Sequence, residues 1–169
     1  MQQAFSRDSH YHGSTRRTAV VLVNLGTPDS PGYFDVMRYL REFLSDPRVV
    51  GLPRLLWLPI LYGIILPFRS RASGLKYAEI YDNKKGMPLL YHSQAVCDAL
   101  KKDLSNTHPH VDVYLAMRYG APSLDSILTS IAKTPVRDIL FLPMFPQYSQ
   151  ATTATIVDRV TSITKKWRF

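Results

Sequence analysis

The sequence carries five histidines and a single cysteine, the side chains that most readily exchange a proton or bind a metal near neutral pH. The histidines are His10, His12, His92, His108 and His110. The first two lie in a polar tail, the third in a helical pattern, and the last two on either side of a proline, so we expect solvated or packed roles for all of them. Cys97 alone excludes an intrachain disulfide and a cysteine-based cluster, and it fits a reducing compartment.

The turn at residues 24–27 is the first place where we expect a binding site. It ends an apolar run at residues 20–23, which is typical of a central parallel strand covered by helices on both faces. Gly26 lets the backbone turn, and Ser30 with Pro31 is suited to cap and begin a helix. Ligands of open α/β sheets bind outside the carboxyl ends of the strands. An ordinary strand-to-helix loop explains these residues equally well, and no glycine-rich phosphate-loop pattern is present.

Residues 55–68 are fourteen residues without a charge, between Arg54 and Arg69. The run is shorter than the roughly 20 apolar residues that cross a bilayer, and prolines and a glycine interrupt it. It is either a packed core element or an exposed lip, spanning 52–68, that contacts a membrane or a flat apolar ligand. Aromatic residues between arginines favour the lip. The predicted lip side chains are Trp57, Leu58, Ile60, Leu61 and Tyr62.

Strand and helix patterns alternate along the chain and predict a Rossmann-like α/β fold, a parallel sheet flanked by helices. After the first strand we expect helices at 31–44, 70–81, 88–104, 121–132 and 151–165, and strands at 111–119 and 139–142. Phe34, Leu75, Ala78, Ile80 and Val96 are among the side chains expected to face inward, and the third strand reads as apolar on both faces. No strand pattern follows the final helix. The fold therefore looks truncated before its last strand, and we expect the apolar face of that helix to stay partly wet.

Composition indicates one globular domain at residues 19–169 after a disordered basic tail at 1–18, since 46% of the 169 residues are hydrophobic and 20% charged. No secretory signal is visible in the tail, which points to the cytoplasm. The net charge of +8 favours anionic partners, whether nucleic acid, a membrane surface or a carboxylate ligand. Because the basic residues form scattered pairs with no nucleic-acid motif between them, we expect no nucleic-acid partner.

Several motifs resemble the amino-terminal half of bacterial-type ferrochelatase. They are residues 23–29, 39–46, 86–89, 118–122 and 142–149, which occur in the family's order. The resemblance implies a lyase of haem biosynthesis that inserts ferrous iron into protoporphyrin, held in a cleft between two similar α/β domains. This chain would supply the first domain and one wall of the cleft, and the second domain is absent from it.

The resemblance also implies porphyrin-binding positions, which are Leu25, Arg69, Tyr77, Met87, Arg118, Tyr119, Tyr148 and Ser149. A porphyrin is an apolar plate with anionic propionates at one edge, so flat apolar walls with a few cations and hydroxyl donors suit it. Arg69 and Tyr77 match positions near the propionates, and Arg118 is expected to lend positive potential. Met87 stands where the family usually has serine, which removes a hydroxyl donor.

The catalytic histidine and glutamate of the family lie in the half that this chain lacks, so we expect no catalytic residue and no metal ligand here. Gln150 stands where some relatives place an iron–sulfur cysteine, so no cluster and no other prosthetic group is implied, and iron and porphyrin are substrates. The alternative function is a tetrapyrrole-binding domain without turnover. Expected partners are a porphyrin, a carboxyl-terminal half and, through the lip, the surface of a membrane.

Overall fold

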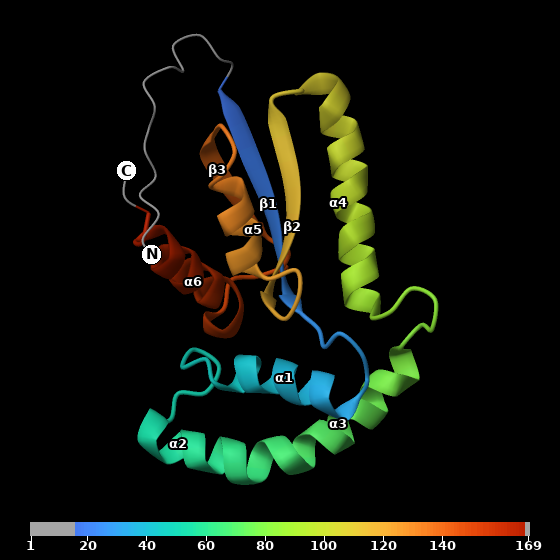
Figure 1. Cartoon of the computed structure of the whole chain (residues 1–169), viewed down its shortest axis with the longest axis vertical. Helices are drawn as coiled ribbons and strands as arrows, with labels where there is room; N and C mark the ends of the chain where they lie inside the picture. Colours follow the sequence, from blue (N-terminus) through green and yellow to red (C-terminus); the bar gives the residue numbers. More distant parts are fainter. Residues whose placement is uncertain (1–15, 168–169) are drawn as a thin grey trace.

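The computed structural model describes residues 16–167, and the described chain forms an open parallel sheet flanked by helices (Figure 1). The strands are β1 (Arg17–Gly26), β2 (Val111–Tyr119) and β3 (Val136–Pro143), in the order β2-β1-β3. Both pairs are parallel, as right-handed crossovers through helices require. The predicted Rossmann-like α/β class is confirmed. His10 and His12 and most of the predicted tail lie outside the described residues, while β1 begins at Arg17, inside the stretch expected to be tail.

The central strand β1 is buried on both faces, as its apolar run predicts. Gly26 at its end has φ +108°, and a Cβ there would lie 1.8 Å from the carbonyl oxygen of Tyr119. The end of β1 therefore passes so close to the end of β2 that only glycine fits.

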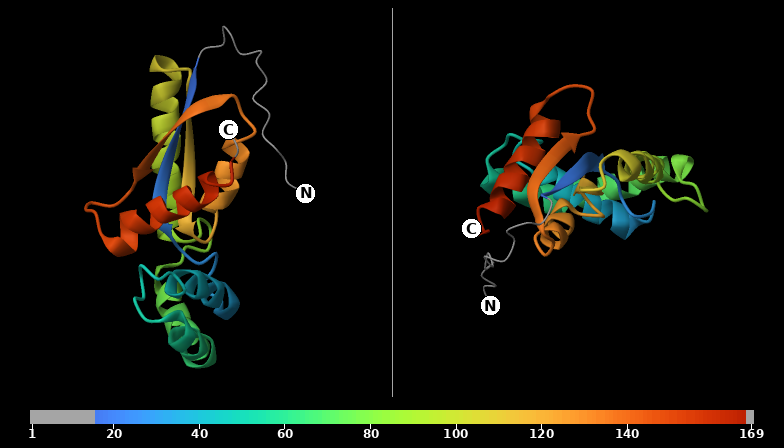
Figure 2. Two further views of the ribbon diagram at one scale, coloured as in Figure 1. Left: turned by 90° about the vertical axis from the view of Figure 1, so that its left-hand side faces the viewer. Right: turned by 90° about the horizontal axis from the view of Figure 1, so that it is seen from above.

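Helices cover the two faces of the sheet unequally (Figure 2). Val21 and Val23 pack with α5 (Leu124–Ile131) and α6 (Thr155–Thr164), whereas Val20 and Leu22 pack with α4 (Pro88–Thr107). The apolar face of α6 joins the first of these clusters through the buried Ile156, so this helix does cover the sheet. Val160 and Ile163 are only partly buried and Val157 is exposed, so the face stays partly wet, as expected.

The edge strand β3 is apolar on both faces but covered on only one. Ile139 and Phe141 pack with the α5–α6 cluster, while Leu140 and Leu142 on the other face are exposed. The prediction of burial on both faces is wrong because α4 packs over β1 and β2 and makes no extensive contact with β3 in the described chain. Val96, also expected inside, is exposed on α4, which buries Ser93 and Cys97 instead.

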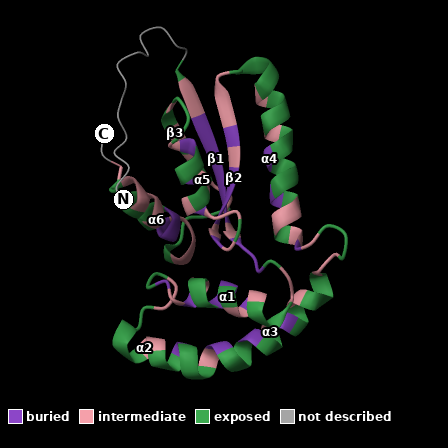
Figure 3. Ribbon diagram, viewed as in Figure 1, coloured by how far each residue is buried: buried purple, intermediate pink, exposed green. Residues whose placement is uncertain are grey.

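A helical lobe lies beneath the carboxyl ends of the strands (Figures 1 and 3). It consists of α1 (Tyr33–Leu44) and of three consecutive helical segments, α2 (Arg54–Ile60), the π-helix η1 (Leu61–Ile65) and α3 (Leu66–Ile80), which we call the arm. Gly32, and not Ser30, stands at the N-cap of α1, because the Ser30 hydroxyl donates to the Asp35 carboxylate. Phe34 on α1 is exposed, contrary to prediction.

The arm packs against α1 and the loop before it, and small residues lie at the contact. Ser70 and Gly74 are buried, and a Cβ at Gly74 would lie 2.8 Å from the carbonyl oxygen of Pro31. The predicted inward face is wrong, since Leu75, Ala78 and Ile80 are exposed on α3. The helices approach closely where the side chains are smallest, and this leaves larger apolar side chains on the outside.

Candidate functional site at the carboxyl edge of the sheet

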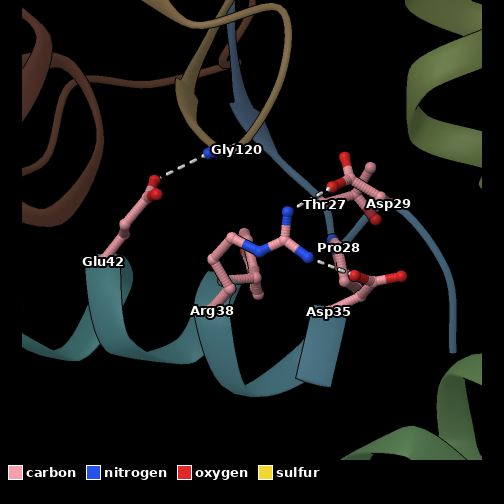
Figure 4. Close-up of a pocket in the computed structure, with 8 residues that line it drawn as sticks. Thr27, Pro28, Asp29, Asp35, Arg38, Glu42 and Gly120 are labelled. Carbon is pink, nitrogen blue, oxygen red and sulfur yellow. Dashed lines mark hydrogen bonds and ion pairs between the residues drawn. The ribbon is translucent and has the colours of Figure 1, made fainter. Parts of the chain in front are cut away.

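A polar hollow lies where the β1–α1 loop, α1 and the β2–α5 loop meet (Figure 4). Arg38 donates to Asp29 at 3.3 Å and to Asp35, and Glu42 accepts the Gly120 N–H at 2.9 Å. The hollow is also lined by Thr27, Pro28 and Tyr39. Three carboxylates around one guanidinium disfavour an anionic ligand, so this hollow does not suit a propionate.

The turn predicted as a binding site is held rigidly. The Asn24 side chain is buried, where its amide donates to the Ser93 hydroxyl at 3.0 Å and its oxygen accepts the Leu25 N–H at 2.8 Å. Leu25 is half-buried and packs against the helical lobe. The turn therefore joins the sheet, α4 and the lobe, and Leu25 stays partly exposed.

Two residues matched to propionate binding lie on α3. Arg69 is exposed, and Tyr77 is half-buried with its ring edge-on to Tyr39, the centroids 6.3 Å apart. Burial raises the pKa of Tyr77, so its phenol keeps its proton at neutral pH and can donate to a carboxylate.

Two more of the matched residues lie in the loop between β3 and η2 (Gln150–Ala154). Tyr148 and Ser149 are both exposed. Ser149 also caps the start of η2, because its hydroxyl lies 2.7 Å from that of Thr152 and its N–H donates to the same Thr152 oxygen at 3.1 Å. Contact of these residues with a porphyrin stays a prediction.

Three of the matched side chains lie inside the protein. Met87 and Tyr119 are each 1% exposed. Arg118 is 15% exposed and donates to Asp46 at 2.5 Å and to the carbonyl oxygen of Thr155 at 3.0 Å. In this arrangement none of the three is presented to a ligand, and the carboxylate of Asp46 balances the positive charge expected to act from Arg118.

Asp46 is a buried residue that the sequence analysis missed, because the Asp46-Pro47 pair reads simply as the end of a helix. It also accepts the Tyr119 hydroxyl at 2.9 Å, and burial raises the pKa of that phenol. The position of Asp46 in the sequence does indicate a partner. A carboxylate just past the C-terminus of a helix is disfavoured by the helix dipole, which favours pairing with a cationic side chain.

The predicted lip divides into an inner and an outer set. Leu61 is fully buried, and Trp57 and Leu58 are half-buried against α1, which differs from their predicted exposure. Ile60 and Tyr62 are exposed. The outer set also includes Leu55, Leu56, Ile64 and Phe68.

Two of the three described histidines lie apart from these groups. His108 and His110 adjoin the amino end of β2, opposite the carboxyl edge, and His92 is exposed on α4 beside the ring of Tyr91. Within residues 16–167 no three His, Cys, Asp or Glu side chains are grouped so as to hold a metal ion. Over the same residues, no helix has the length and apolar character needed to cross a bilayer.

The chain is an α/β domain in which Arg69, Tyr77, Tyr148 and the apolar arm lie on elements at the carboxyl end of the sheet. The family model described as Ferrochelatase matches residues 17–169, and this chain belongs to the ferrochelatase family. It is similar to the ferrochelatase of Janthinobacterium sp. (strain Marseille), with 51% identity over 153 residues that cover 90% of this chain and 41% of that protein. Ferrochelatase of Dechloromonas aromatica (strain RCB) is 46% identical over 159 residues, which cover 94% of this chain and 43% of that protein.

The alignment with a third relative covers almost the whole of this chain. Ferrochelatase of Azoarcus sp. (strain BH72) is 42% identical over 168 residues, which cover 99% of this chain and 46% of that protein. The chain thus spans less than half the length of the curated relatives it matches.

Proposed function

We propose that this chain supplies one wall of a porphyrin site in an enzyme that inserts ferrous iron into protoporphyrin. The observation that carries the proposal is the family match over residues 17–169. The exposed Arg69, the protonated phenol of Tyr77 and the exposed Tyr148 supply the cation, donor and aromatic surface that a plate with propionates requires. The site is specific for an anionic tetrapyrrole by virtue of Arg69.

Metal insertion also needs a base that removes two pyrrole protons, and losing a general base forfeits a factor of about 100 to 10,000 in rate. We propose that this chain provides binding without that base and without a bound prosthetic group. Two of the three described histidines support this, because His108 and His110 lie at the opposite end of β2 from the site.

The test is zinc insertion by the purified chain, alone and mixed with a carboxyl-terminal half from the Janthinobacterium relative. We expect porphyrin binding without turnover from the chain alone, and turnover from the mixture. Turnover by the chain alone that disappears in His92→Ala would overturn the assignment of the base to the other half. Binding without turnover in both samples would favour the second candidate, a tetrapyrrole-binding domain.

The outer face of the arm supports a further part of the proposal, contact with the surface of a membrane. Leu55, Tyr62, Ile64 and Phe68 are exposed, and Arg54 adjoins them at the start of α2. Apolar side chains beside basic residues are the makeup of an interfacial segment on an anionic membrane.

A further inference from the structure

Asp46 is bonded to parts of the chain that are far apart in the sequence. One carboxylate oxygen accepts from the Arg118 guanidinium at 2.5 Å and from the Tyr119 hydroxyl at 2.9 Å, and the other accepts the Arg48 N–H at 2.8 Å. The Asp46 side chain is 6% exposed. Because the site is buried, loss of the carboxylate leaves several donors without their partner.

The same cluster extends to α6. Arg118 donates to the carbonyl oxygen of Thr155, the first residue of that helix, at 3.0 Å. Arg48 binds both carboxylate oxygens of Asp158 on α6, at 2.7 and 3.1 Å. The end of β2 and the loop after α1 are therefore both tied to α6, and α6 directly continues η2 and the loop of Tyr148 and Ser149.

On its other side the cluster holds the base of the arm. The Asp46 carbonyl oxygen accepts the N–H groups of Val49 and Val50, each at 3.0 Å, which folds the loop before α2 into a tight turn. Trp57 on α2 donates to the carbonyl oxygen of Leu44, two residues before Asp46. Asp46 thus stands between the arm and the β3–η2 loop.

We propose that Asp46 is a positioning residue that fixes the arm relative to the loop of Tyr148 and Ser149. The proposal rests on the proposed function, since it is in a porphyrin site that these two groups must face one ligand from different elements. Asp46 and Arg118 form a neutral buried pair, so they act on the ligand through the placement of other residues. Preorganised placement of binding groups lowers the ordering cost of binding.

A distance measurement without porphyrin tests the positioning role by itself. Spin labels are attached to Leu56→Cys on α2 and Gln150→Cys on η2 in a Cys97→Ala background, and both labelled positions are exposed. We expect a narrow distance distribution that broadens in Asp46→Asn. Asp125→Asn is the matched control, because it breaks a bidentate pair with Arg159 that ties α6 to α5 instead.

An unchanged distribution in Asp46→Asn would overturn the proposal, and so would equal broadening in Asp125→Asn. If Asp46→Asn does not fold, Tyr119→Phe removes a single donor to the same oxygen. Broadening in Tyr119→Phe then supports the role, and a distribution as narrow as that of the unchanged chain rejects it.

A titration of protoporphyrin, followed at its Soret band, links the placement to binding. We expect Asp46→Asn to raise the Kd about 10-fold, which corresponds to about 1.4 kcal/mol. Tyr148→Ala should weaken binding less in the Asp46→Asn background than alone, a coupling that a loss of stability does not produce. Additive losses would contradict the positioning role. If the unchanged chain binds no porphyrin, the proposed function fails, and the label distances still decide the role of Asp46.

Discussion

Trp57 donates its indole N–H to the backbone carbonyl oxygen of Leu44 at 2.7 Å, which ties the first helix of the arm to the end of α1. On the same side, Trp57 and the buried Leu61 of η1 pack in the cluster with α1, while Leu55 and Leu56 are exposed. The apolar run at 55–68 is therefore core on its inner side and exposed on its outer side. The two explanations that the sequence leaves open each describe one side of this helical run.

The two faces should respond differently to shortening of a leucine. Leu61 is 0% exposed and Leu55 is 90% exposed. We expect Leu61→Ala to lower the free energy of unfolding by about 2 to 5 kcal/mol through loss of burial and a residual cavity. Leu55→Ala should stay within about 0.5 kcal/mol. Urea unfolding of both variants measures the difference, and equal effects would show that Leu61 is not in the core.

Binding to anionic vesicles should depend on the outer face alone. In co-sedimentation we expect Leu55→Ser combined with Phe68→Ser to reduce the bound fraction, because both side chains are exposed on the arm. Leu142→Ser, which alters an exposed leucine on β3, is the matched control and should bind as the unchanged chain does. A loss of binding in the control equal to that in the arm variant would place the membrane contact elsewhere.

A methyl group should be tolerated at one glycine and not at another. At Gly26 the left-handed backbone and the 1.8 Å approach to the Tyr119 oxygen make Gly26→Ala severely destabilising, by at least about 2 kcal/mol. At Gly63 in η1 nothing lies within 4 Å of the added atom, and Gly63→Ala should stabilise by about 0.5 to 1 kcal/mol. Thermal unfolding of the two variants distinguishes the positions, and a stable Gly26→Ala chain would contradict the close approach of β1 and β2.

Acid should weaken the link between the α1–α2 loop and α6. Hydrogen bonds from Arg48 lower the pKa of Asp158 below its ordinary value of 3.8. The unfolded chain therefore takes up a proton there before the folded chain does. The contribution of this pair is complete above about pH 4 and is lost as the pH falls through the lowered pKa. We expect Asp158→Asn to narrow the gap between the urea midpoints at pH 6 and pH 3, and an unchanged gap would show that the pair adds no stability.

The strands of this chain follow from local pattern more directly than its helix faces do. The boundaries of β2 match the predicted 111–119, since a half-buried strand alternates with a period of two. The predicted inward face of α3 is wrong because the pattern counts large apolar side chains, whereas α3 buries Ser70 and Gly74, the latter close to the carbonyl oxygen of Pro31 just before α1. Close approach of two backbones selects small residues, and hydrophobic periodicity does not register them.

The candidate site shows the same division. Arg69 and Tyr148 are exposed, as a ligand contact requires, and their contact with a porphyrin stays a prediction. The motif at 118–122 could not reveal that Arg118 points to a carboxylate 72 positions earlier in the sequence, because that pair forms only once α1 lies under β2. Likewise, both faces of β3 are apolar in the sequence. Only the packing shows that α4 does not cover the face of Leu140 and Leu142.

We propose that the exposed Arg69 guanidinium on α3 receives a propionate of a bound porphyrin. A Soret titration of the chain with protoporphyrin should show saturable binding that Arg69→Ala weakens by about 1.5 to 3 kcal/mol, the value of a hydrogen bond to a charged group. Arg71→Ala, two residues along the same helix and also exposed, should change it little. A porphyrin without propionates should bind the unchanged chain and Arg69→Ala equally. An equal loss for both porphyrins, or no saturable binding by the unchanged chain, would contradict the claim.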